Sequence, residues 1–242
     1  MAFTTIICEN YREMSEKAAH LAVETISADR DTLISFPAGD TPLGMVEEFT
    51  GMVNRGEADI SRTRYVSLDE WVSLGPNDEG SCAWFIKTRL LQKLKKPFLE
   101  TFVINGQAAD PVAECGRLNS FIDRYGPLDL SVLGIGMNGH LGFNEDGVDF
   151  KLRAHVSPLS ETTRSVMHKY FSRTYDLQFG ITQGLLQIMA AKRVILIASG
   201  IHKADILRRA LQGPVDASVP ASILQGHPGL FVVADKSAAS AL

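Results

Sequence analysis

The stretch LDLSVLGIGMNGHLGFNEDG, residues 128–147, begins as an apolar run and ends as a loop that contains five glycines. The apolar half predicts a buried strand, because continuous apolar runs are typical of strands that are covered on both faces. A plain turn needs one or two glycines, so five indicate backbone that approaches something closely. Asn138, His140 and Glu145 lie on this backbone, which predicts side chains aimed into a site.

Apolar, β-branched runs alternate with helical periodicity along the rest of the chain. Strands are predicted at 3–9, 31–37, 63–68, 101–105, 128–136, 193–199, 218–224 and 230–235. Helices are predicted at 14–26, 41–53, 81–94, 110–125, 180–190 and 201–212, whereas the polar segment 150–178 carries no assignment. The alternation predicts an α/β fold, with one domain over residues 1–242 and a doubly covered, mainly parallel sheet.

The composition is that of an ordinary globular protein, with 45% hydrophobic and 21% charged residues in a chain of 242. This length suits one large domain or two small ones. The net charge of −4 and the lack of a lysine or arginine block argue against nucleic acid as a partner. No apolar run approaches the roughly 18 residues that span a bilayer, so a membrane partner is not expected.

Cysteine and histidine spacing predicts neither disulfides nor a metal site. Cys8, Cys82 and Cys115 are odd in number and share no short spacing, which predicts reduced thiols in a cytoplasmic protein. The first residues lack the basic and apolar regions of a signal peptide, in keeping with the cytoplasm. For Cys82, we favour a small buried side chain over a nucleophile. The histidines never fall in a metal-ligand pattern such as HxxxH.

Polar clusters follow four of the predicted strands at the point where each strand ends. They are PAGDTP (37–42), DEW (69–71), MNGHLGFNE (137–145) and SGIHK (199–203). In open α/β sheets, ligands bind outside the carboxyl ends of the strands. If the strands are parallel, all four loops meet at one edge, and the sequence predicts a single site there.

Two of these loops predict a place for an anion. Gly39, Asp40 and Thr41 come at a helix start, where free backbone N–H groups can hold phosphate. Taken alone, this loop favours an ordinary N-capped helix, and Asp40 would repel a phosphate unless its side chain turns away. Lys203 is expected in the first turn of a helix, where the macrodipole disfavours a cation unless an anion is bound; a solvated lysine is the alternative. Together the loops predict a phosphorylated small molecule as ligand.

Two further pairs predict acid–base chemistry. Asp69 and Glu70 end a strand beside Trp71, where partial desolvation would raise the pKa of a carboxyl towards that of a general base. An aspartate that starts a turn is the alternative. His140 and Glu145 form the second pair, because a carboxylate can orient an imidazole for proton transfer near neutral pH. A histidine without such a partner would more often be structural.

The motifs PAGDTP, LDEWVSL, LGIGMNGHLGFNE and SGIHK together resemble those of the amino-sugar-phosphate deaminase/isomerase family. Glucosamine-6-phosphate deaminases belong to it, and 6-phosphogluconolactonases are relatives that share its Rossmann-like fold. The resemblance covers nearly the whole chain, and the pairing of LDEW with GHLGFNE is specific. LDEW with NGHLG is most similar to the galactosamine-6-phosphate isomerase branch. The resemblance implies cofactor-free isomerisation of a 2-amino-2-deoxyhexose 6-phosphate with loss of ammonia, in carbohydrate catabolism.

The resemblance also implies roles for individual residues. Asp69 resembles the general base that takes the C2 proton and returns it at C1. His140 resembles the residue that opens the pyranose ring, with Glu145 as its partner carboxylate and Asn138 in the same catalytic group. The implied phosphate-binding residues are Gly39, Asp40, Thr41, Lys169 (in the place of an arginine) and Lys203, and the implied substrate-lining residues are Glu70, Gly136 and Gly142.

The sequence departs from the family pattern at three places. Asn138 replaces an aspartate, so the imidazole would rely on Glu145 alone for negative charge. Asp40 replaces a small residue of the phosphate loop. His155 and Ser157 replace basic residues that bind an allosteric activator in hexameric members, so we expect no such control and a monomer or small homo-oligomer.

Two other functions remain as alternatives. A 6-phosphogluconolactonase-type hydrolase is disfavoured by Trp71 and by Phe143-Asn144-Glu145, because lactonases usually carry arginine and a Ser-Leu-Phe type sequence at these places. A sugar-phosphate-binding regulator without catalysis would usually carry an added DNA-binding segment, for which this chain has no basic patch. Neither the C4 epimer of the substrate nor the role of 150–178 as a candidate lid follows from the sequence.

Overall fold

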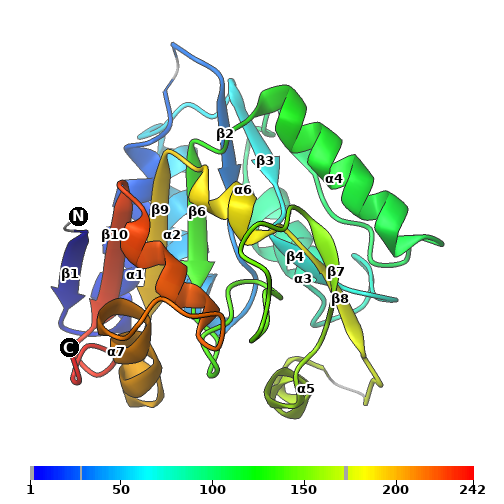
Figure 1. Cartoon of the computed structure of the whole chain (residues 1–242). Helices are drawn as coiled ribbons and strands as arrows, with labels where there is room; N and C mark the ends of the chain where they lie inside the picture. The colour runs from blue at the N-terminus through cyan, green and yellow to red at the C-terminus, as the bar shows by residue number, and fades with distance from the viewer. Residues whose placement is uncertain (1–2, 28, 172–173) are drawn as a thin grey trace.

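A seven-stranded parallel sheet forms the centre of the computed structural model, which describes residues 3–27, 29–171 and 174–242. Its strands are β1 (Thr4–Cys8), β2 (Thr32–Ser35), β3 (Thr63–Val66), β5 (Glu100–Phe102), β6 (Leu130–Gly134), β9 (Arg193–Ala198) and β10 (Leu230–Asp235). They are ordered β1-β10-β9-β6-β2-β3-β5, and each neighbouring pair is parallel (Figure 1). The predicted single-domain α/β fold is confirmed.

Helices cover both faces of this sheet because its inner strands are apolar on both sides. On β9, Ile195 and Ile197 pack into one core, whereas Val194 and Leu196 pack into the other, as the alternation of strand side chains requires. Helices α1 (Tyr11–Val23) and α2 (Asp40–Arg55) cover the first face. Helices α4 (Pro111–Tyr125), α6 (Leu185–Met189) and α7 (Ala204–Gln212) cover the second (Figure 1).

A second, three-stranded antiparallel sheet lies beside the carboxyl ends of the central strands. It consists of β4 (Asp69–Trp71), β8 (Phe179–Thr182) and β7 (His155–Pro158), in that order. Helix α5 (Glu161–Met167) and the 3-10 turn η3 (His168–Tyr170) follow β7. We call β4, β7, α5, η3 and β8 the cap. They include residues 155–158 and 161–170 of the candidate lid 150–178, of which residues 172 and 173 lie outside the described residues.

Several predicted elements differ in the structure. The strand predicted at 218–224 is wrong: Pro220–Gly226 forms the 3-10 helix η5, because Pro220 cannot donate to a ladder and its apolar neighbours pack under α7. The helix predicted at 180–190 is β8 followed by the short α6. Residues 69–71, predicted as a loop, form β4.

The helix predicted at 81–94 is divided into three short turns. Ser81 caps its start by accepting from the Trp84 N–H, and the α-helical turn α3 spans Cys82–Phe85. The chain continues as the π-helix η1 (Ile86–Leu90) and the 3-10 turn η2 (Leu91–Lys93). Within the described part of the chain, no helix is both long and apolar enough to cross a membrane.

Candidate active site

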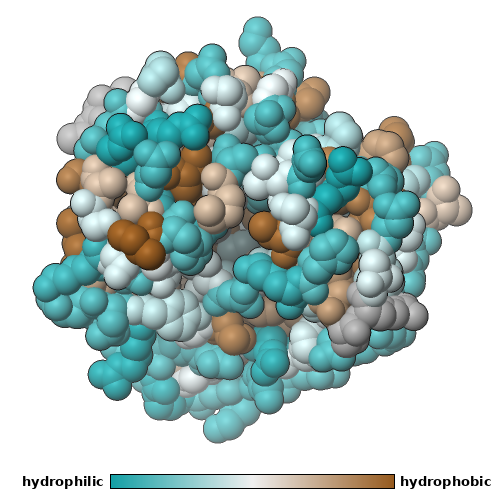
Figure 2. All heavy atoms as spheres, turned by 90° about the horizontal axis from the view of Figure 1, so that it is seen from below, coloured by the Kyte–Doolittle hydropathy of each residue, from teal (hydrophilic) through white to brown (hydrophobic). Residues whose placement is uncertain are grey.

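A cleft of about 750 Å³ opens at the carboxyl ends of β2, β6 and β9. Figure 2 looks onto this edge and shows the hollow near the middle of the face. All four polar loops contribute to the wall, and a smaller hollow of about 290 Å³ continues from it past Asp69 towards Arg89. The predicted site residues that line the cleft are Gly39, Asp40, Thr41, Asp69, Gly136, His140, Gly142, Lys169 and Lys203.

His140 lies in the wall of the cleft, against the backbone of Gly136. A Cβ atom at position 136 would come within 2.4 Å of the imidazole Nε2, so glycine alone leaves room for the ring. The other ring nitrogen, Nδ1, lies 3.3 Å from Glu145 Oε2 and 3.2 Å from Thr163 Oγ1. One glycine of the loop thus permits the position of the imidazole, and two polar groups fix its orientation.

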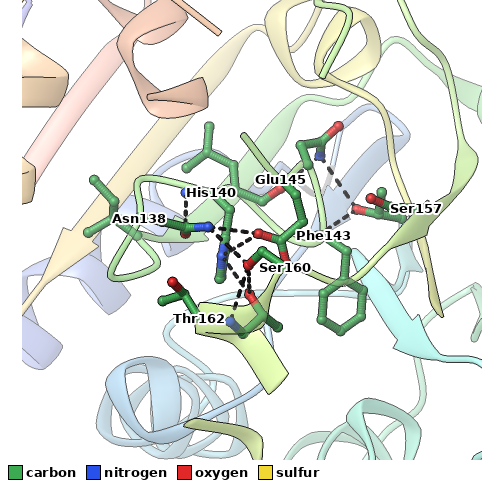
Figure 3. Close-up of polar contacts among 12 residues, drawn as sticks. Asn138, His140, Phe143, Glu145, Ser157, Ser160 and Thr162 are labelled. Carbon is green, nitrogen blue, oxygen red and sulfur yellow. Dashed lines mark hydrogen bonds and ion pairs between the residues drawn. The ribbon is translucent and has the colours of Figure 1, made fainter. Parts of the chain in front are cut away.

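Glu145 is buried behind His140 and is ionised at neutral pH. Burial would raise its pKa, but the hydrogen bond and charge of His140, with hydrogen bonds from Thr163 and Asn138, lower the pKa to about 2. Asn138 Nδ2 donates to Glu145 Oε2 over 2.8 Å and to Ser160 Oγ over 3.2 Å (Figure 3). Asn138 therefore holds the carboxylate in place, which an aspartate at that position would instead repel.

Ser160 and Thr163 belong to this network although the sequence analysis missed both. They begin α5, where Ser160 Oγ accepts from the Thr163 N–H over 3.2 Å. Ser160 directly before Glu161, an N-cap residue followed by an acidic residue of the first turn, was a usable sign of a helix start within the unassigned segment. Their contact with His140 is tertiary, since β7 and the loop before it separate them in the chain.

Asp69 lies at the start of β4, where it is paired with Thr182 of β8. Burial raises its pKa to about 6, although a hydrogen bond from the Cys82 thiol and the charge of His140 oppose the rise. A Cβ atom at Gly142 would lie 3.4 Å from Asp69 Oδ2, so the glycine-rich loop runs beside this carboxyl. A half-buried carboxyl that titrates near pH 6 can accept and return a proton at neutral pH.

Glu70 does not line the cleft, in contrast to the prediction from the sequence. Successive strand residues point to opposite faces, so Glu70 turns away from the side that Asp69 occupies and is fully buried. Its carboxyl oxygens accept backbone N–H bonds from Trp71, Cys82 and Ala83, at 2.8, 3.1 and 2.6 Å. Glu70 thereby anchors the 81–85 turn beside Asp69, which is a structural role.

The start of α2 forms the opposite end of the cleft. The helix begins at Asp40, earlier than the predicted start at Thr41, and Gly39 is its N-cap with φ of 112°. This left-handed conformation favours glycine. Among the described residues, no side chain caps the helix, so its first N–H groups are free for an anion.

Lys203 ends the 3-10 turn η4 (Ile201–Lys203) directly before α7 and reaches into the same end of the cleft. Its Nζ donates to the Ile135 carbonyl oxygen over 2.7 Å. Burial, together with the charge of Lys169, lowers the pKa of Lys203 to about 8. A half-buried ammonium group beside a second cation and a free helix start is suited to an anionic ligand.

Lys169 lies on η3 and is paired with the side chain of Asp40. Asp40 Oδ2 and Lys169 Nζ are 2.9 Å apart. Cys8, Cys82 and Cys115 are buried free thiols, of which Cys82 is the one that contacts Asp69. Within the described ranges, no group of three or more histidine, cysteine or acidic side chains could hold a metal ion.

Comparisons with known proteins identify the class to which this fold and cleft belong. Residues 9–232 match the model of the family described as glucosamine-6-phosphate isomerases/6-phosphogluconolactonase, and the chain belongs to this family. The family predicted from the sequence motifs is therefore confirmed, whereas its galactosamine-6-phosphate isomerase branch stays a prediction.

The relatives that the comparisons found are similar over their full length. The chain is 39% identical to the glucosamine-6-phosphate deaminase of Lachnoclostridium phytofermentans, over 93% of this chain and 95% of the relative. It is 37% identical to that of Halothermothrix orenii, over 98% and 99%. The solved structure of a monomeric glucosamine-6-phosphate deaminase matches with a TM-score of 0.93 at 33% identity, covering 99% of this chain and all of the other.

Proposed function

We propose that this protein converts glucosamine 6-phosphate and water into fructose 6-phosphate and ammonia. The observation that carries this proposal is the half-buried carboxyl of Asp69, with a pKa near 6, in the same cleft as the His140–Glu145 pair and Lys203. The similarity to glucosamine-6-phosphate deaminases over almost the whole chain supports the choice of substrate.

The phosphate of the substrate binds at the start of α2. Backbone N–H groups of residues 39–41, the Thr41 hydroxyl and the Lys203 ammonium group supply its donors, and Lys169 adds a second cation. This arrangement leaves C1 and C2 of the sugar at the other end of the cleft, towards Asp69 and His140.

Ring opening comes first and depends on His140. The Glu145 carboxylate accepts the Nδ1–H hydrogen bond, which leaves Nε2 as the basic nitrogen. Nε2 removes the proton of the anomeric hydroxyl and returns it to the ring oxygen as the bond between C1 and that oxygen breaks. The product of this step is the open-chain aldehyde.

Asp69 then moves the proton between adjacent carbons. Its carboxylate removes the C2 proton, the electron pair forms the C1=C2 bond of an enolamine, and O1 takes up a proton from the 2-ammonium group of the substrate. Asp69 returns its proton at C1, which leaves an iminium ion at C2. Water adds to C2, its two protons leave with the nitrogen as ammonia in its protonated form, and the C2 ketone remains. Atoms and charge therefore balance, and positioned acids and bases suffice without a cofactor.

An ammonia-release assay with both C4 epimers tests the proposal. Glucosamine 6-phosphate should release ammonia, and galactosamine 6-phosphate is a second candidate substrate because LDEW and NGHLG resemble that branch. Lactone hydrolysis without ammonia release would instead indicate a 6-phosphogluconolactonase, and tight binding without turnover of either epimer would indicate a regulator.

We also infer the setting in which the enzyme works. A monomer or small homo-oligomer is proposed, in line with the monomeric deaminase of similar structure, and sedimentation of the purified protein tests it. The three free, buried thiols support a reducing compartment such as the cytoplasm. Closure of residues 150–178 as a lid stays a prediction, which hydrogen exchange with and without substrate would test.

A further inference from the structure

The Asp40–Lys169 ion pair joins the loop of residues 37–42 to the cap at the mouth of the cleft. The two residues are 129 positions apart in the chain, and Asp40 Oδ2 lies 2.9 Å from Lys169 Nζ. Both side chains line the cleft and both are largely exposed, at 73% and 52%. The contact therefore lies where an incoming substrate phosphate would first meet the protein.

The backbone around Asp40 is held firmly, so its side chain is the part that can exchange partners. The Tyr11 hydroxyl donates to the Asp40 carbonyl oxygen over 3.0 Å and accepts from the Gly44 N–H over 2.8 Å. The hydroxyl of Tyr170 lies 3.6 Å from where a Cβ atom on Gly39 would be. The loop is thus held by hydrogen bonds from α1 on one side, and Tyr170 of η3 lies near it on the other.

The ammonium group of Lys169 contacts two side chains, those of Asp40 and Tyr170. Burial tends to lower its pKa, but the hydrogen bond to Asp40 and contact with Tyr170 outweigh this, and the pKa is raised. Its Nζ lies 4.6 Å from the centroid of the Tyr170 ring. Asp40 is the carboxylate that pairs with it among the described residues, so the ammonium group is engaged before any ligand binds.

We propose that Asp40 competes with the phosphate of the substrate for Lys169, so that binding replaces one ion pair by another. This inference rests on the proposed function, which puts a phosphate at the start of α2 beside Asp40. The phosphate can pair with Lys169 only when Lys169 loses its contact with Asp40. The bound phosphate then lies close to the unpaired carboxylate of Asp40. Asp40 therefore lowers the affinity for phosphate, and it acts in part through Lys169.

A double-mutant cycle on inorganic phosphate binding tests the competition. Calorimetric titration would compare wild type, Asp40→Asn, Lys169→Met and the double variant. Asp40→Asn should bind phosphate about two- to fivefold more tightly, since an exposed ion pair of modest strength no longer has to be broken. The same substitution should give a smaller gain in the Lys169→Met background, where only direct repulsion between Asp40 and phosphate is removed.

A matched control separates this effect from a change in net charge. Asp123 of α4 forms a similarly exposed pair with Arg153, with 2.5 Å between Asp123 Oδ1 and Arg153 Nη2, and it lies outside the cleft. Asp123→Asn should leave the phosphate affinity unchanged. Melting temperatures of all variants would establish that each is folded.

Three outcomes would overturn the inference. Equal gains from Asp40→Asn in both backgrounds would mean that Asp40 only repels phosphate, and no gain or a loss would mean that it does not oppose binding. Failure of phosphate to bind any of the four proteins would remove the anion site itself. Ammonia release is measured on the same samples, so that a failure of this inference can be told from a failure of the proposed function. Ammonia release together with equal gains in phosphate affinity in both backgrounds contradicts only the competition. A gain that is larger when Lys169 is present, without ammonia release, contradicts only the deamination.

Discussion

The central sheet and the cap contribute different kinds of group to one cleft. The loops after β2, β6 and β9 supply backbone N–H groups, the imidazole of His140 and the ammonium group of Lys203. The cap supplies Asp69 from β4 and, from α5, the hydroxyl of Thr163 that contacts His140. Of the two proposed proton-transfer groups, Asp69 therefore comes from the cap, and His140 contacts a hydroxyl group of the cap.

The two regions also differ in how they are held together. Strands β6 and β9 are buried between two helical layers, so their loops start from a rigid edge. The cap rests on a small cluster in which the Trp71 ring centroid lies 4.6 Å from that of Phe143 and 5.9 Å from that of Phe171. This difference indicates that the proposed phosphate site depends mainly on loops of the central sheet, to which the cap adds Lys169, whereas the position of Asp69 depends on the docking of the cap.

The largest expected effect comes from the cap. Asp69→Asn removes the proposed base and keeps its shape, so kcat for ammonia release should fall by about a hundred- to ten-thousandfold. Binding of inorganic phosphate, which depends on the other end of the cleft, should change little. Turnover close to that of wild type would show that Asp69 is not the base.

On the side of the central sheet, Lys203→Met should act on binding. Loss of a charge-assisted hydrogen bond to phosphate should raise KM by about 10- to 100-fold, with a much smaller change in kcat. Steady-state kinetics over a wide substrate range measures both quantities. A fall in kcat at unchanged KM would contradict the division of roles between the two regions.

The pH dependence separates the two ends of the cleft in the wild-type protein. Asp69 must be ionised to act, and with a pKa of about 6 its ionised fraction, and hence kcat, should fall about tenfold between pH 7 and pH 5. Lys203 must be protonated to bind phosphate, so KM should rise as the pH passes about 8. A kcat that is flat from pH 5 to 7 would be incompatible with Asp69 as the base.

A smaller effect on turnover is expected at the contact between α5 and the His140 loop. Thr163→Val removes the hydroxyl that contacts His140 Nδ1 at nearly constant volume, and kcat should fall about two- to tenfold. Thr163→Ser keeps the hydroxyl and should restore most of the activity. If valine and serine behaved alike, packing of α5 rather than its hydrogen bond would account for the change.

The sequence predicted the central sheet better than it predicted the cap. Runs such as 194–198 and 230–234 are apolar throughout, so burial on both faces leaves little alternative to a strand, and parallel order then brings the following loops together. The Asp69–Glu70 pair shows the limit, because strand alternation sends one carboxyl to the cleft and the other into the core.

The rest could not be predicted because it depends on tertiary contacts. Ser160 and Thr163 lie in a polar segment whose local pattern indicates a helix start, yet their role follows from their contact with the His140 loop. Likewise 218–224 has the composition of a strand, but Pro220 and packing under α7 make it a 3-10 helix.

A crystal structure of Asp69→Asn with glucosamine 6-phosphate tests most directly whether the two ends of the cleft act on the two ends of one substrate. We expect the phosphate within hydrogen-bond distance of Lys203 Nζ and the backbone N–H groups of residues 39–41, with C2 of the sugar facing residue 69. A phosphate bound near Arg89 in the smaller hollow, or a sugar whose C2 points away from residue 69, would contradict it.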